Sequence, residues 1–93
     1  MTKHVLDIRI LPEEYDAFVR LLPNDESFPR TYDGWLKKRT EENAKYIAHG
    51  DILDEVIVHP QELSVYAAGA GLPLSTEMLR AAAVKKFSRQ QQL

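Results

Sequence analysis

The feature that most constrains the fold of this chain is a likeness between its two halves. Residues 7–22 and 55–70 align at a constant offset of 48, which places Pro12 opposite Pro60. Both stretches begin with alternating apolar residues, the pattern of a half-buried strand. In both, the proline then stands where a helix begins, a position that needs no backbone N–H and suits the fixed φ of proline. Each stretch therefore predicts a strand followed by an amphipathic helix.

A shorter similarity follows at an offset of 44. It places Pro29 opposite Pro73 and Trp35 opposite Leu79, and it predicts a second, Ser- or Thr-capped helix in each half. We interpret the chain as an internal duplication of the form βαα-βαα. The alternative is that strand, proline and helix form a common local solution that two unrelated segments share.

The pattern predicts the bounds of each element. The two pseudo-repeats cover residues 4–49 and 52–87. Strands are expected at 4–11 and 53–59, and helices at 12–22, 31–48, 60–70 and 75–87. The segment 24–30 is predicted to be an exposed loop, and the glutamine-rich segment 88–93 a frayed tail.

Burial within the second predicted helix follows from its apolar residues. The candidates for burial are Tyr32, Trp35, Leu36, Ala44, Ile47 and Ala48. Trp35 aligns with an apolar residue of the other repeat, so we expect it to anchor the core and to take no part in a ligand site.

These elements predict one α+β domain spanning residues 1–93. Four helices are expected to cover one face of two strands, because an isolated two-stranded ribbon is only marginally stable. Duplicated halves are commonly related by a pseudo-two-fold axis, so we predict adjacent antiparallel strands. A parallel pair joined by the helical crossover is the alternative.

Composition excludes several classes of protein. The 93 residues carry a net charge of −2, which argues against a generally basic nucleic-acid-binding coat. The sequence has no cysteine, which excludes disulfides, thiol nucleophiles and cysteine-ligated metals. It also lacks an apolar run of the roughly 20 residues that a membrane span needs. We therefore expect a soluble, cytoplasmic protein without membrane attachment.

The histidines do not form a recognisable catalytic or metal-binding motif. His4, His49 and His59 are scattered over a strand start, a helix end and a strand end, without the HExxH spacing of zinc enzymes. His49 at a helix C-terminus is explained by the helix dipole, and His59 by a surface or packing role. We expect no catalytic, cofactor-binding or metal-binding site, although a fold can bring together residues that sequence spacing does not connect.

Charge is distributed unevenly over the second half. Residues 51–74 carry a balance of −4, whereas residues 75–93 carry +3. The basic residues of the last helix form a speculative interaction surface, comprising Arg80, Lys85, Lys86 and Arg89. The alternative interpretation is an ordinary solvated face of a terminal helix, whose C-terminal end favours cations.

Residues 62–86 resemble, in part, the helix-turn-helix family of DNA-binding motifs. The small Ala67 and the glycine four residues later precede a capped helix, as in that family. Glu77, however, stands where the pattern requires an apolar residue, and Pro73 lengthens the turn. The resemblance implies a nucleic-acid-binding regulator that uses the final basic helix. A plain αα-hairpin explains the same residues, and we consider nucleic-acid binding the weaker interpretation.

The absence of a catalytic motif favours a small non-enzymatic protein-interaction or scaffold domain. A nucleic-acid-binding regulator is one alternative, and a small-ligand binder or an enzyme with an unrecognised site is another. Unpaired strand edges lead us to expect a homodimer, because strand addition across a two-fold axis satisfies backbone groups left open at an edge.

Overall fold

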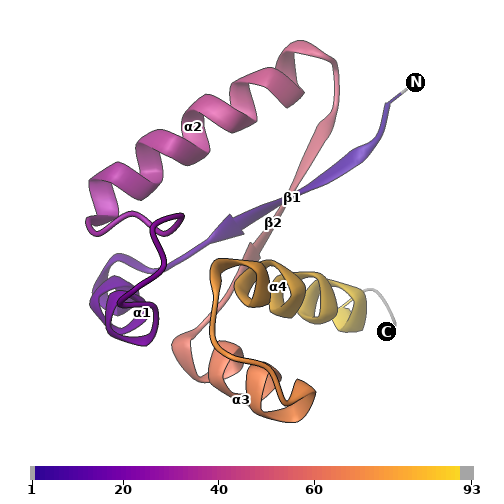
Figure 1. The fold of residues 1–93 in the computed structure, drawn as a ribbon. Helices are drawn as coiled ribbons and strands as arrows, with labels where there is room; N and C mark the ends of the chain where they lie inside the picture. The colour runs from indigo at the N-terminus through magenta and orange to yellow at the C-terminus, as the bar shows by residue number, and fades with distance from the viewer. Residues whose placement is uncertain (1, 91–93) are drawn as a thin grey trace.

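The structure, a computed structural model, describes residues 2–90 and is α+β, with two strands and four helices (Figure 1). The elements follow the predicted order, with one additional 3-10 turn, η1. They are β1 (His4–Arg9), η1 (Pro12–Glu14), α1 (Tyr15–Leu21), α2 (Tyr32–Ala48), β2 (Ile52–Ile57), α3 (Pro60–Ala70) and α4 (Thr76–Gln90). Among the described residues, none of the helices combines the length and the apolarity that crossing a bilayer requires.

The two strands are parallel, so the prediction of an antiparallel pair is wrong. The crossover is long enough for a parallel connection, and α2 carries the chain back to the end of the sheet where β1 starts. Gly50, with φ of 82°, then turns the chain directly from α2 into β2. The register pairs Ile8 with Val56, which is the same offset of 48 that relates the two sequences.

Helices cover both faces of β1, not a single face as predicted. Ile8 is 8% exposed and belongs to the hydrophobic core. Asp7, which points to the opposite face because side chains alternate along a strand, is 1% exposed and accepts a hydrogen bond from Asn43 of α2 at 3.0 Å. In Figure 1 the strand pair runs between α2 and α4.

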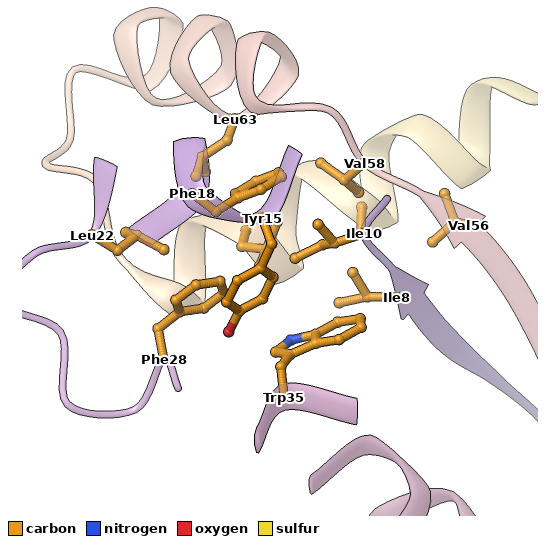
Figure 2. Close-up of a cluster of buried hydrophobic side chains, with 12 residues drawn as sticks. Ile8, Ile10, Tyr15, Phe18, Leu22, Phe28, Trp35, Val56, Val58 and Leu63 are labelled. Atoms are coloured by element: carbon orange, nitrogen blue, oxygen red, sulfur yellow. The ribbon is translucent and has the colours of Figure 1, made fainter. Parts of the chain in front are cut away.

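The core combines aliphatic side chains from both halves with four aromatic side chains, all of which come from the N-terminal half (Figure 2). The rings of Tyr15 and Phe28 stack with centroids 5.1 Å apart, and the rings of Tyr15 and Trp35 lie at 6.2 Å. Trp35 is 6% exposed, which confirms its predicted burial. Phe28, predicted to lie in an exposed loop, is 2% exposed because it fills the space beside Tyr15.

The second half of α2 differs from the prediction. Ala44, Ile47 and Ala48 are exposed, and the buried residue there is Asn43. Asn43 is turned inward because the side chain of Asp7 on β1 offers it a hydrogen-bond acceptor. Hydrophobicity alone therefore predicted the wrong face for this part of the helix.

The ends of the helices follow their local sequence signals. Thr31 accepts a hydrogen bond from the Gly34 amide, and Ser75 accepts one from the Met78 amide, as expected of N-caps. α4 continues to Gln90, so residues 88–90 are helical and not frayed, while 91–93 lie outside the described residues.

Candidate functional site

An open groove of about 1400 Å³ lies between α3 and α4, and we call it the α3–α4 groove. Figure 1 shows these two helices side by side. The apolar surface of the groove comes from side chains on the two facing helices. They include Val65, Tyr66, Ala70 and Ala82. Val65 is 63% exposed.

One end of the groove is polar and internally paired. His59 Nδ1 lies 2.7 Å from Glu14 Oε1, and the His59 amide donates to Glu62 Oε1 at 2.8 Å. Lys86 donates to the same Glu62 oxygen at 2.9 Å and also to the carbonyl of Ile57. Burial by itself would raise the pKa of Glu62, but the His59 amide and the Lys86 ammonium outweigh it and lower that pKa. The polar groups at this end of the groove are therefore hydrogen-bonded to one another.

The α4 side of the groove carries cations without a carboxylate partner. The Lys85 ammonium lies 5.5 Å from the centre of the Tyr66 ring, a cation–π geometry. Arg89 lines the groove one turn further along the helix. Neither Lys85 nor Arg89 forms an ion pair with the residues that the structure describes.

The structure divides the four basic residues predicted to form one interaction surface. Lys85, Lys86 and Arg89 line the α3–α4 groove. Arg80 borders a separate, smaller pocket beside α2. Nine residues of α-helix amount to a half-integral number of turns, so Arg80 and Arg89 occupy opposite faces of α4.

The three histidines stay apart in space. His59 lies in the groove, His4 pairs with Asp54 at 2.8 Å, and His49 is an exposed residue after α2. Over residues 2–90 the structure forms no group of three side chains able to hold a metal ion. A histidine beside a carboxylate, as in the His59–Glu14 pair, can act as a general base for a nucleophile. Within residues 2–90, however, no serine or threonine lines the groove to be that nucleophile.

Sequence reasoning missed the contact between Glu14 and His59, which lie 45 residues apart. A signal existed in the aligned prolines. If the strands are parallel, Pro12 and Pro60 follow their strands at the same end of the sheet, and the residues beside them meet. The antiparallel prediction placed these two prolines at opposite ends.

The segment that resembles a helix-turn-helix is a helical hairpin with a five-residue connection, 71–75, between α3 and α4. Gly71, with φ of 67°, ends α3 in the left-handed conformation. A duplication would place the same hairpin in the first half, but α1 and α2 diverge and do not pack along their lengths.

No known family model matches the chain, and the curated proteins and solved structures contain no significant match to it.

Proposed function

We propose that this chain is a protein-interaction domain that binds an acidic, amphipathic helical peptide in the α3–α4 groove. The observation that carries the proposal is the combination of exposed apolar side chains with cations that lack carboxylate partners. Helix-in-groove binding uses these two features, an apolar face for affinity and charge for orientation.

The apolar surface supplies the anchor sites. Val65 and Ala70 on α3 face the groove together with Ala82 on α4. Because alanine side chains are short, the two helices leave room for larger side chains from a partner. Burial of the exposed Val65 side chain by a partner would favour binding, by about 25 cal/mol for each Å² of apolar surface removed from water.

The charges favour an acidic partner. Lys85 and Arg89 stand on the α4 side, whereas Glu14 and Glu62 are already bound by His59 and Lys86. A peptide carboxylate near Arg89 therefore meets a guanidinium that no described residue neutralises. A basic peptide would meet the same cations and be repelled.

The dimensions favour a peptide over a small molecule. The groove volume of about 1400 Å³ exceeds the roughly 300–1,000 Å³ of ordinary small-molecule pockets. α3 has 11 residues, which corresponds to a length of about 16 Å or three helical turns. A partner helix of similar length would place apolar residues at i, i+4 and i+7 along the groove.

A labelled model peptide tests the proposal by fluorescence anisotropy. The probe is a helical 15-residue peptide, with leucines at i, i+4 and i+7 and glutamates on the flanking positions. We expect saturable binding, and a loss of about tenfold or more in affinity for Arg89→Gln, because charge-assisted hydrogen bonds are among the stronger contacts.

The matched control is Arg80→Gln, which removes the same charge from the opposite face of α4. It should leave peptide affinity within about twofold. A second peptide, with lysines in place of the glutamates, should not bind. Equal loss in both variants, or equal binding of both peptides, would show that the groove does not select an acidic partner.

We also propose that the chain forms a homodimer. Each strand has a single neighbour in the described chain, so each has an edge without a strand partner. Lys86 occupies a carbonyl on the outer edge of β2, which leaves the edge of β1 as the more accessible one. Sedimentation should detect a dimer at high micromolar concentration, and monomer alone would exclude this idea.

A further inference from the structure

A second pocket lies on the other side of α4, beside Arg80, and we call it the Arg80 pocket. It is small, about 60 Å³, and lies between the first turns of α4 and the middle of α2. Three cations border it, Lys38, Arg39 and Arg80, together with one carboxylate, Glu42. The charge at its border is therefore +2, in a protein whose net charge is −2.

The cations of this pocket are only partly neutralised. Arg39 pairs with Glu42 one turn along α2. Lys38 donates to the backbone carbonyl of Ser27 at 3.2 Å, a neutral acceptor. Arg80 forms no ion pair with any residue between 2 and 90. The N–H groups of Arg80 and two of the three on Lys38 remain free to bind a ligand.

The environment of Arg39 shows that these charges are crowded. Its side chain is only 16% exposed. Burial lowers the pKa of the Arg39 guanidinium, the charge of Asp7 raises it, and the nearby Arg80 lowers it further. The like charges of Arg39 and Arg80 repel each other beside this pocket, and an anion bound in the pocket would offset that repulsion.

The remaining walls strengthen an ionic contact. Trp35 and Leu79, both nearly buried, line the pocket and keep water from one side of it. A ligand in this pocket would lie against Trp35, contrary to the expectation that Trp35 takes no part in a ligand site. Electrostatic attraction is stronger where the local dielectric is low. Asp25, a carboxylate of the loop before α2, is committed elsewhere, because its oxygens accept hydrogen bonds from the Thr76 amide, the Thr76 hydroxyl and the Ser27 amide.

We propose that the Arg80 pocket binds a compact tetrahedral oxyanion, either free phosphate or a single phosphoryl group on a small molecule. Arg80 and Lys38 approach it from two helices and form the primary contacts, while Arg39 supplies a charge behind them. The size of the pocket limits the occupant, because 60 Å³ is far below the roughly 300 Å³ of the smallest ordinary ligand pockets. The proposal is independent of peptide binding in the α3–α4 groove.

Trp35 provides the readout, because it is the only tryptophan of the chain and lines the pocket. Inorganic phosphate is titrated at constant ionic strength, balanced with chloride, and binding is followed by tryptophan fluorescence and by calorimetry. O-phosphoserine in a parallel titration distinguishes a phosphate monoester from the free ion. We expect saturation with half-binding below about 10 mM for at least one of the two probes.

Two variants localise the binding. Arg80→Gln should weaken it by about tenfold or more, whereas Arg89→Gln, which removes the same charge from the opposite face of α4, should change it by less than about twofold. Lys38→Gln, on the other helix, should also weaken it. Circular dichroism and thermal melting establish that each variant is folded.

Four outcomes would overturn the proposal. The first is a response that does not saturate with either probe in fluorescence or calorimetry. The second is an equal response to added chloride. The third is unchanged affinity in folded Arg80→Gln and Lys38→Gln. If Arg89→Gln weakens binding as much as Arg80→Gln does, the ion is attracted by overall charge and the pocket does not bind it.

Discussion

The two halves of this molecule share an order of elements but fill the space around their helices differently. In the N-terminal half, Tyr15, Phe18 and Phe28 close the region around α1 with aromatic rings. In the C-terminal half, Ala67 and Ala82 stand between α3 and α4, and an open groove remains. The first half thus buries large side chains, and the second half leaves a surface.

This difference separates stability from binding within one small domain. Large aromatic side chains gain most from burial, so the N-terminal half contributes much of the hydrophobic stabilisation. Small side chains allow α3 and α4 to approach each other, while the apolar surface beside their contact stays open to solvent. The comparison predicts that substitutions around α1 change stability, whereas those in the α3–α4 groove change binding.

The largest expected effect is that of Trp35→Ala. Removing this nearly buried indole leaves a cavity in the aromatic core and should cost about 3–5 kcal/mol of unfolding free energy, measured by urea denaturation. Val65→Ala, in the groove, is the control and should change stability by no more than about 0.5 kcal/mol. If the two variants unfold alike, the division between the halves is wrong.

High pH should lower the unfolding free energy, through the ionisation of Tyr15 in the N-terminal half. Burial raises the pKa of Tyr15 from 10.0 to about 12, against the opposing charge of Arg30. The unfolded chain therefore loses this proton first, so the stabilisation is complete below about pH 10 and is lost as the pH rises towards 12. The difference between the pKa of Tyr15 in the folded and unfolded chain corresponds to about 2–3 kcal/mol of unfolding free energy.

Comparison with Tyr15→Phe isolates this contribution from the other titrating groups. Near pH 8.5 the variant should be less stable by about 1 kcal/mol, because the Tyr15 hydroxyl donates to the Pro29 carbonyl. Between pH 10 and 12 that gap should close and change sign. A gap that stays constant with pH would mean that Tyr15 titrates normally.

A smaller effect should come from the link between the halves. Asp25, in the loop of the first half, accepts hydrogen bonds from the Thr76 amide and hydroxyl and so caps α4. Asp25→Ala should cost about 1–2 kcal/mol near pH 7. The exposed neighbour Glu26 offers the control, and Glu26→Ala should have little effect.

This contribution should also depend on pH. Hydrogen bonds from the Thr76 amide and hydroxyl lower the pKa of Asp25. Its stabilisation is therefore present above the ordinary pKa of about 4 and is lost as the pH falls through the lower, folded value. The stability gap between the parent and Asp25→Ala should narrow below about pH 4, and a gap that widens there would contradict the cap.

The smallest expected signal is binding to duplex DNA. Arg80 and Arg89 face opposite directions, and Lys86 is held by Glu62, so α4 presents no continuous basic stripe. We expect no gel shift at about 150 mM salt, where non-specific binders reach roughly 10⁻⁴–10⁻⁶ M. A salt-sensitive shift that disappears in the double variant Lys85→Ala/Arg89→Ala would instead support the helix-turn-helix resemblance.

Much of the local structure could be predicted from sequence because its causes are local. Pro60 and Gly50 act through their own backbone geometry, and Ser75 acts through a side-chain hydrogen bond to the Met78 amide three residues later. Each stands at the helix or turn boundary that it predicted. The α+β class and the order of elements follow from the same signals. Whether the two halves share an ancestor stays a prediction, because agreement in order and register does not test it.

The strand direction, the burial of Asn43 and the α3–α4 groove could not be predicted, because they depend on contacts between segments that are distant in the sequence. Strand direction is set by the path of α2, and neither strand carries a local signal for it. Asn43 is buried because of Asp7, 36 residues away, and no apolar periodicity reports such a polar pair. The groove likewise forms only once α3 and α4 pack together, although three of its basic residues had been named from charge alone.

The position of Lys86 has a consequence for growth of the sheet. The Val58 amide donates to Arg9, so the Ile57 carbonyl, in the same peptide unit, points away from β1. Lys86 binds that carbonyl and is held there by Glu62. A third strand, from whatever source, could pair fully along β2 only by displacing the Lys86 ammonium from the Ile57 carbonyl. The interaction that closes one end of the groove thus also obstructs edge-to-edge pairing along β2, while the edge of β1 stays open.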